Sequence, residues 1–379
     1  MSVSEVKIKM VRLGEYLEEI DERNSDGNYT LDDVRGISVT KKLISTNANM
    51  QDVSLTPYKL LKPNEFAYVE DTSRRGDKIA IAINDSDETY LVSSVYKVFK
   101  CKDVKELHPK FLFLFINRNE FDRYSRFNSW GSARETFNWD ELCNIQIPLP
   151  HIDLQQELVE TYDSLKSLAE QNEALIEPLT KACQAYIVNC KKAYPEVELG
   201  DYIDELDERN SNAKYTINDV RGISILKELI PTKADMKDVS LSPYKLLKPN
   251  NFAYVTVTSR NGGKVSLAIN NSDETYIVSS SYIVFKSKDV RELHPKFLFL
   301  LFIRDEFDRY SRFNSWGSAR ETFDWDELCR VRIPLPPPEV QQAIVKLYNC
   351  AEEAKKIACD AREKMKTLCP ALVQKAISA

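Results

Sequence analysis

The chain has 379 residues, which is enough for two or three domains that each bury a core of their own. Hydrophobic residues make up 43% of the sequence and aromatic residues 10%, which excludes a disordered chain. No apolar run approaches the roughly 20 residues of a membrane-spanning helix, and the first ten residues lack the apolar core of a signal peptide, so we expect no membrane contact. The net charge of −6 argues mildly against DNA binding, although basic residues can still line one cleft.

The cysteines and histidines give no metal-site pattern. The eight cysteines contain no Cys-x-x-Cys pair, and the three histidines are too few to complete zinc sites with them. We therefore expect reduced, mostly buried thiols in a cytoplasmic protein, with no metal.

An internal duplication with a constant offset of 186 residues (197 − 11) dominates the sequence. About 70% of the positions between Val11 and Gln156 are identical in the second copy, and no insertion interrupts the match. The matched strings include 11–16 with 197–202, 35–38 with 221–224, 57–64 with 243–250, 128–137 with 314–323, and 147–150 with 333–336. A period of this length is a whole duplicated domain with its connector rather than a solenoid repeat.

The first part of each copy has the pattern of a mixed α/β (α+β) domain. Alternating and β-branched residues predict strands at 79–83, 91–92 and 96–99. Apolar residues at helical spacing, among them Phe111 and Phe121, predict one helix over 109–124. Glycine-containing turn signals separate these elements.

The second part of each copy predicts one long helix, at 152–190 and at 340–377. Both segments lack glycine and carry apolar residues three to four positions apart, in the same register. The first seam is predicted to run through Leu154, Leu158, Thr161, Leu165, Leu168, Asn172, Leu175, Leu179, Ala182 and Tyr186, and the second through Val340, Ile344, Leu347, Ala351, Ala354, Ala358, Ala361, Met365, Leu368 and Leu372. An antiparallel coiled coil would match large residues with small ones, with Leu168 near Ala361, Asn172 near Ala358 and Leu175 near Ala354.

Two prolines and one asparagine interrupt these patterns. Pro178 and Pro370 are predicted to kink or end the long helices. Asn172, a polar residue within an apolar seam, is expected to fix the register of the helices rather than to bind a ligand.

The order of the motifs, repeated twice, resembles the specificity subunits of type I restriction-modification enzymes. The strings that carry the resemblance are Leu-His-Pro-Lys-Phe-Leu at 107–112, the segment from Gly131 through Trp-Asp-Glu-Leu at 139–142, and Ile-Pro-Leu-Pro at 147–150 followed by Gln155 and Gln156. Their second copies end in Ile-Pro-Leu-Pro-Pro-Pro at 333–338, followed by Gln341 and Gln342. The resemblance covers nearly the whole chain.

This resemblance implies two target-recognition domains related by a pseudo-twofold axis and joined by two spacer helices. We expect recognition domains at 1–150 and 193–336, with spacer helices at 151–192 and 337–379. The implied partners are double-stranded DNA, two methyltransferase subunits and restriction (motor) subunits. Catalysis is then expected from the partners, because the sequence has no adenine-methylation motif, no Gly-rich cofactor loop and no Walker A pattern. No cofactor is expected on this chain.

The two copies are more alike than the resemblance leads us to expect. Specificity subunits of this type usually carry two dissimilar domains that read two different half-sites. Near-identical domains instead predict a bipartite target whose half-sites are inverted repeats or nearly so.

Polar and basic residues in two segments of each copy are candidates for DNA contact. The segment around 126–134 combines arginines with aromatic residues, and the glycine-hinged loop at 72–78, with the two residues before it, has differences between the copies concentrated at positions 70, 71, 75 and 77. The candidates in the first copy are Arg74, Arg75, Lys78, Arg126, Asn128, Ser129 and Arg134, and those in the second are Arg260, Asn261, Lys264, Arg312, Asn314, Ser315 and Arg320.

Each candidate has a structural alternative. Arg134 and Arg320 could instead pair with the adjacent Glu135 and Glu321, the run at 123–129 could be a solvated helix face, and the loop differences could be drift. Four tryptophans, Trp130, Trp139, Trp316 and Trp325, are expected in the core, because large aromatic residues are usually buried. His108 and His294 precede proline at predicted helix starts, and we assign them no chemistry.

Two other functions remain as alternatives. A protein-interaction adaptor built from duplicated domains would account for the acidic net charge, but it leaves the arginine-rich runs unexplained. A self-contained DNA methyltransferase is disfavoured, because its motifs are missing.

Overall fold

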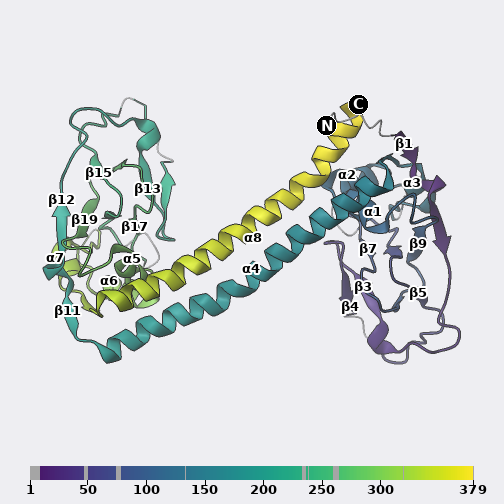
Figure 1. Ribbon diagram of the computed structural model, residues 1–379, viewed down its shortest axis with the longest axis horizontal. Coiled ribbons are helices and arrows are strands. Elements are labelled where there is room, and N and C mark those ends of the chain that lie inside the picture. Colours follow the sequence, from purple (N-terminus) through teal and green to yellow (C-terminus); the bar gives the residue numbers. More distant parts are fainter. Residues whose placement is uncertain are drawn as a thin grey trace. The chain divides into compact units, whose positions relative to one another are not determined.

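A computed structural model describes residues 9–378 apart from 47–49, 74–77, 133, 233–235, 238, 259–263 and 319, and beyond residue 368 it describes the backbone alone. The chain divides into two compact units. The first contains residues 1–171 and 357–379, and the second contains residues 172–356. Each unit therefore holds one copy of the duplicated domain together with parts of both long helices (Figure 1).

A four-stranded antiparallel sheet in the order β2-β9-β6-β7 forms the centre of the first unit. Phe66 pairs with Phe99 on one side and with Ile83 on the other, so the apolar residues of the middle strands enter the core together. The strands of the first unit are β1 (Lys9–Arg12), β2 (Leu17–Ile20), β3 (Arg35–Ile37), β4 (Leu43–Ser45), β5 (Lys59–Leu61), β6 (Phe66–Tyr68), β7 (Ile81–Ile83), β8 (Tyr90–Val92), β9 (Lys97–Cys101) and β10 (Gln146–Leu149). The remaining strands form the two-stranded pairs β1-β10, β3-β4 and β5-β8.

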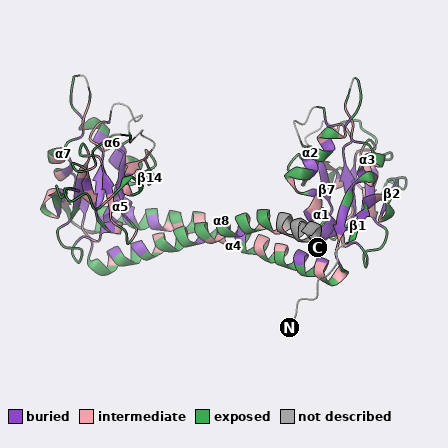
Figure 2. Cartoon of the chain, turned by 90° about the horizontal axis from the view of Figure 1, so that it is seen from above, coloured by how far each residue is buried: buried purple, intermediate pink, exposed green. Residues whose placement is uncertain are grey.

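Short helices cover this sheet, with α1 against β7 (Figure 1). The residues that face the interior between them are buried (Figure 2). The helices are η1 (Leu13–Glu15), η2 (Leu31–Asp33), α1 (Pro109–Ile116), α2 (Asn119–Phe127), α3 (Trp139–Asn144) and the long α4 (Ile152–Ala193).

The second unit repeats every element of this domain in the same order. Its sheet runs β12-β19-β16-β17, with the pairs β11-β20, β13-β14 and β15-β18 beside it. The elements are β11 (Glu196–Glu198), η3 (Leu199–Asp201), β12 (Ile203–Leu206), η4 (Ile217–Asp219), β13 (Arg221–Ile223), β14 (Leu229–Pro231), β15 (Lys245–Leu247), β16 (Phe252–Tyr254), β17 (Leu267–Ile269), β18 (Tyr276–Val278), β19 (Ile283–Ser287), α5 (Pro295–Phe302), α6 (Asp305–Phe313), α7 (Trp325–Cys329), β20 (Arg332–Pro334) and the long α8 (Pro338–Ser378). The predicted duplicated mixed α/β fold is confirmed.

A buried glutamine joins the first domain to its long helix. Gln155 is fully buried, and its Oε1 accepts the backbone N–H of His108 at 2.8 Å. Its Nε2 donates to the carbonyl oxygens of Glu106 at 2.8 Å and Pro150 at 2.9 Å. Gln341 makes the same three bonds in the second copy. The first glutamine of the repeated Gln-Gln motif is therefore a structural clamp.

The predicted helix over 109–124 is two helices in the structure. Asn117 ends α1, and Arg118 is extended (φ −98°, ψ 151°) before α2 begins. The apolar residues of α1 are mostly buried, whereas α2 buries one face only. The chain breaks between α1 and α2 because one straight helix could not direct the apolar residues of both segments into the same core. The predicted strands at 91–92 and 96–99 are confirmed within β8 and β9, and the strand at 79–83 is shorter, at 81–83.

The two long helices pack together within each unit. In the second unit, Cys183 and Ile187 of α4 share one core cluster with Ile344 and Val345 of α8. In the first unit, Tyr162 of α4 and Met365 of α8 line the same pocket. The start of each helix lies with the end of the other, so the pair is antiparallel, as predicted. On α8 the predicted seam positions Ala351, Ala354, Ala358 and Ala361 are all buried.

The predicted seam on α4 is partly wrong. Leu168 and Leu175 are 43% and 51% exposed, and the buried positions include Ala169 and Cys183 instead. Apolar residues stand next to one another at several places along α4, so the sequence allowed two neighbouring registers. The proposed packing of Leu168 on Ala361 and of Leu175 on Ala354 therefore does not describe the buried seam.

The prolines do not end either long helix. Helix α4 continues through Pro178, and the backbone of α8 continues through position 370. Pro178 is exposed, so the carbonyl group that loses its helical partner can bond to water. None of the helices in the described part of the chain is long and apolar enough to cross a membrane.

Candidate nucleic-acid interface

Helix α2 carries the basic and aromatic residues of the predicted interface on its outer face. Its inner face buries Phe121, whose ring meets the edge of Phe137 with centroids 6.5 Å apart. The Ser125 hydroxyl donates to the Phe121 carbonyl oxygen at 2.8 Å, and the Ser129 hydroxyl donates to the Ser125 carbonyl oxygen at 2.6 Å. The outer residues of α2 are thus left free of the core.

Two candidates, Ser129 and its equivalent Ser315, are turned inward. Both residues are buried, and the Ser315 hydroxyl repeats the bond of Ser129 with a distance of 2.6 Å to the Ser311 carbonyl oxygen. Each hydroxyl serves to end a helix. The prediction that these two serines face DNA is therefore wrong.

A small antiparallel ladder follows α2. Trp130 and Thr136 exchange both backbone hydrogen bonds, at 3.1 and 3.0 Å. The turn between them requires Gly131, which has φ +143°, because a Cβ at this position would lie 2.1 Å from the Arg134 carbonyl oxygen. Gly317 has the same role, with φ +140° and a distance of 2.2 Å to the Arg320 carbonyl oxygen.

This ladder ties together the two segments that the sequence singled out. Thr136 also forms a bridge with Asp71, and the Thr72 N–H donates to the Glu135 carbonyl oxygen at 3.0 Å. In the second copy Thr322 bridges Val257 in the same way. The start of the loop, at 71–73, and the segment at 130–136 are therefore neighbours, although more than 50 positions separate them in the sequence.

A buried ion pair anchors the far end of the loop. The Lys41 Nζ lies 2.8 Å from Asp122 Oδ1, and their side chains are 4% and 10% exposed. The same carboxylate oxygen accepts the Ile79 N–H at 3.3 Å, just after the loop returns to the sheet. Burial lowers the pKa of Lys41, and the Asp122 carboxylate opposes this effect. Lys227 and Asp308 form the equivalent pair at 2.6 Å.

The arginines of the interface differ in how they are paired. Arg126 forms an ion pair with Glu135, and Arg312 pairs with Glu321 at 2.5 Å. The alternative that these glutamates hold Arg134 and Arg320 is thus wrong, because the helix arginines occupy them. Arg134 and Arg320 are exposed and have no ion-pair partner among the described residues.

The remaining candidates are placed as follows. The Asn128 Nδ2 donates to the Tyr124 carbonyl oxygen at 2.9 Å, and Asn314 makes the same bond to Tyr310 at 2.9 Å. Lys78 and Lys264 are exposed. Four candidates, Arg74, Arg75, Arg260 and Asn261, lie outside the described residues, as do positions 77 and 263.

One difference between the copies has a direct structural consequence. The Asp71 carboxylate accepts the Ser73 N–H at 3.0 Å and the Ser73 hydroxyl at 2.7 Å, which fixes the start of the loop. Val257 stands at this position in the second copy, and its side chain has no oxygen with which to accept a hydrogen bond. A side-chain bond of this kind is therefore open to the first copy alone.

Two of the four tryptophans are not in the core. Trp139 and Trp325 pack on Phe99 and Phe285 with ring centroids 5.4 and 5.7 Å apart, as predicted. Trp130 and Trp316, however, are 61% and 63% exposed. Their ladder runs outside the core, so the general tendency of tryptophan to be buried gave the wrong answer here.

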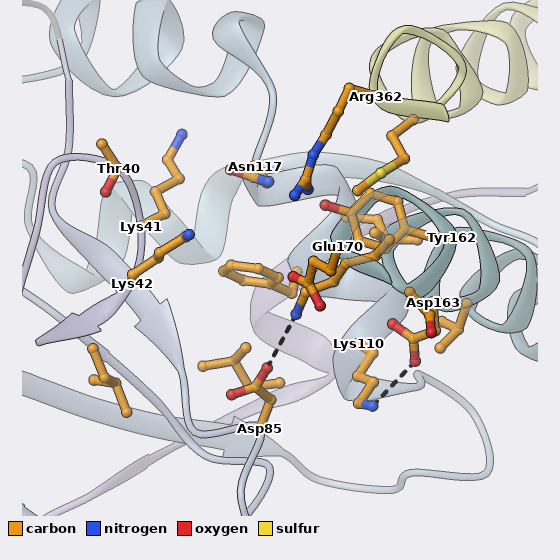
Figure 3. A pocket seen from close by; sticks show the side chains of 18 residues that line it. Thr40, Lys41, Lys42, Asp85, Lys110, Asn117, Tyr162, Asp163, Glu170 and Arg362 are labelled. Carbon is orange, nitrogen blue, oxygen red and sulfur yellow. Dashed lines mark hydrogen bonds and ion pairs between the residues drawn. The ribbon is translucent and has the colours of Figure 1, made fainter. Parts of the chain in front are cut away.

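The first unit also contains a pocket of about 570 Å³, which no sequence pattern predicted (Figure 3). Its walls are formed by the turn at 40–43, by α1, by the first part of α4 and by the later part of α8. Lys110 pairs with Asp163 at 3.2 Å, and Lys166 lies 3.9 Å from Asp85 (Figure 3). Several lining residues differ in kind from their counterparts in the second copy, among them Thr40/Leu226, Lys42/Glu228, Asn117/Ile303 and Glu170/Lys356. A function that both copies share does not depend on this pocket.

Comparison with known proteins gives matches of two kinds, one to a protein family and the others to solved structures. The family model described as the type I restriction modification DNA specificity domain matches residues 21–181 and again residues 205–348. A crystal structure of a type I restriction-modification S subunit from M. genitalium is similar in fold, with 12% sequence identity, a TM-score of 0.60, and coverage of 99% of this chain and 98% of that one. The HsdS subunit from Thermoanaerobacter tengcongensis matches with 18% identity and a TM-score of 0.42, over 98% of this chain and 96% of that one.

No curated protein matches the chain significantly. The family model, however, covers most of the sequence in two separate matches that correspond to the two copies. The chain belongs to the type I restriction modification DNA specificity family, and its function is to give such a system its DNA sequence specificity.

Proposed function

We propose that this chain reads a bipartite duplex target whose half-sites are inverted repeats or nearly so, with one recognition domain on each. The observation that carries the proposal is the equivalence of the two domains, bond by bond, around the candidate interface. The buried Lys–Asp pair, the tryptophan ladder, the constrained glycine and the arginine–glutamate pair all occur twice. Domains that share this framework should share their docking geometry and most of their base contacts.

The proposed division of labour follows the sequence. Recognition domains at 1–150 and 193–336 contact DNA, and the spacer helices at 151–192 and 337–379 hold partner subunits. Phosphate contacts would position each domain, and contacts to base edges would select the sequence. Among the described candidates, Arg134, Lys78 and their equivalents have exposed cationic groups outside the ion pairs with Glu135 and Glu321.

Catalysis in this proposal belongs to the partners. Two methyltransferase subunits bind along the polar outer faces of the long helices and nearby domain surface, and restriction subunits join them in the nuclease form. Support comes from the family membership and from the duplication, which provides two equivalent surfaces. A mass measurement of the complex co-purified with the methyltransferase should give two methyltransferase chains for each copy of this chain, and one or none would contradict this stoichiometry.

Methylome sequencing tests the proposed function. Cells that carry this chain with its methyltransferase should acquire methylated adenine at one bipartite motif, and cells that carry the methyltransferase alone should not. An adaptor that binds only protein would leave no motif that depends on this chain. Two unrelated half-sites would contradict the proposed near-palindromic target.

A further inference from the structure

Two large aromatic side chains beside the candidate loops are much more exposed than their size leads us to expect. Phe127, the last residue of α2, is 78% exposed, and Trp130 is 61% exposed. Phe313 and Trp316 in the second copy have exposed fractions of 80% and 63%. The neighbouring Phe121 and Phe137 already fill the core beneath α2, so the outer pair is available for contact with another molecule.

Hydrogen bonds fix the backbone from which these rings project. The Asn128 N–H and the Asn128 side chain both donate to the Tyr124 carbonyl oxygen, at 3.0 and 2.9 Å, and this fixes the end of α2. The backbone of Trp130 is held by its two bonds to Thr136. Because directly opposite residues in an antiparallel bridge lie on one face, Trp130, Thr136 and Asp71 form a row that leads to the loop. A backbone that is already ordered loses little conformational entropy on binding.

The surrounding charge favours a nucleic acid as the ligand. Arg123 and Arg134 are exposed within the same segment, and Lys78 is exposed at the end of the adjacent loop. Aromatic residues alternating with arginines are typical of surfaces that bind nucleic acids. The centre of a protein interface, in contrast, is usually depleted of charged residues.

The comparison of the two copies indicates what kind of contact the rings make. Residues 120–137 are identical in sequence to residues 306–323, whereas the loop at 70–77 differs from its counterpart at four positions (70, 71, 75 and 77). Stacking on a base tolerates any sequence, because every base has a π face. The identical segment therefore fits a contact common to both half-sites, and the loop fits the part that can vary.

We propose that Phe127 and Trp130, with Phe313 and Trp316, form an aromatic wedge that presses against a base-pair step of each half-site, while the nearby arginines hold the flanking phosphates. Apolar wedges of this kind partly unstack a step and let the distorted duplex contact more protein surface. The inference rests on the proposed DNA target, and it adds a sequence-tolerant contact to the reading of bases.

The test uses the complete complex with its methyltransferase. The substitutions Phe127→Ala and Phe313→Ala together should weaken binding by about tenfold or more, and by the same factor for the target and for targets with one base changed. Phe127→Tyr with Phe313→Tyr should restore most of the affinity, because the ring is kept. Duplexes with 2-aminopurine at successive positions should brighten at one step of each half-site on binding, and this signal should be lost in the alanine variant.

A matched control replaces Val104 and Val290, which occupy equivalent positions in the two copies, with alanine. These residues are also exposed and apolar, and they lie outside the segment of identical sequence, so this variant should bind as the parent does. The inference is overturned if the phenylalanine variant binds like the control, if it relaxes the motif at one base, or if it no longer co-purifies with the methyltransferase. The last result would identify the rings as a protein contact. If the parent complex recognises no bipartite motif, the proposed function is wrong. If the parent recognises such a motif and the double phenylalanine variant binds it as tightly as the parent does, only this inference is wrong.

Discussion

At the scale of single residues, Gln155 and Gln341 allow a sharp test of how each domain is held to its helix. Each side chain is fully buried and makes three hydrogen bonds to backbone groups of three different residues. Gln155→Leu would remove the partner of one buried and two partly buried backbone groups and should lower the free energy of unfolding by about 3 kcal/mol. Chemical denaturation measures this loss. Gln156 is exposed, so Gln156→Leu is the matched control, and equal stability of the two variants would show that the clamp contributes nothing.

Gly131 tests the loop of the interface in the same way. Gly131→Ala places a Cβ against the Arg134 carbonyl oxygen in a backbone conformation that disfavours L residues, so the turn must rearrange at a cost of about 1–3 kcal/mol. Because this turn presents Arg134 and supports the 72–78 loop, the affinity of the complex for its target should fall about tenfold. The exposed neighbour provides the control, Ser132→Ala, in a titration of labelled duplex. If the two variants bind alike, the turn geometry does not matter for DNA binding.

The structure gives two residues roles that sequence reasoning did not assign, although both roles have a local cause. Gly131 allows a tight turn, and the Asn128 side chain, predicted as a DNA contact, bonds to the Tyr124 carbonyl oxygen at the end of α2. Ser129 and Trp130 were misplaced, because their exposure depends on the direction in which the chain leaves α2. The partner of Glu135 is Arg126 rather than the adjacent Arg134. This pairing depends on the ladder, which brings Glu135 back beside α2, and the sequence does not reveal that contact.

At the scale of elements, the buried alanines of α8 determine how closely the long helices approach. Ala358 is 3% exposed within this seam. Ala358→Leu adds three carbon atoms to a filled space and should destabilise the protein by about 1–3 kcal/mol. Cys359 is exposed on the same turn, so Cys359→Leu is the control for thermal denaturation. An unchanged midpoint for Ala358→Leu would mean that the helices separate easily and that the alanine seam has no role.

The elements themselves were largely predictable, and the reasons for the exceptions are physical. Long amphipathic segments without glycine gave α4 and α8 almost to their ends. The division of 109–124 into α1 and α2 was missed, because the break at Asn117 has no glycine or proline to mark it. The register of α4 was missed because adjacent apolar residues offer two seams, and the choice depends on the opposite helix.

At the scale of the whole molecule, the duplication allows the half-site preference of one domain to be compared directly with that of the other. The interface framework is the same in both copies, so a difference in half-site preference should come from the positions that differ. The Asp71 carboxylate bonds to Ser73 in the first copy, and the Val257 side chain has no oxygen for such a bond, so we expect this position to contribute to any difference between the half-sites. Loss of one arginine contact to guanine, as between Arg75 and Asn261, would change discrimination by about 1–3 kcal/mol at that base.

The most direct measurement compares two methylomes, one from the parent chain and one from a chain in which residues 256–263 carry the sequence of 70–77. The parent should methylate a bipartite motif whose half-sites are inverted repeats except at a few bases, and the altered chain should methylate a fully symmetric motif. Two unrelated half-sites in the parent, or an asymmetry that survives the exchange, would contradict the conclusion that two equivalent domains read the target.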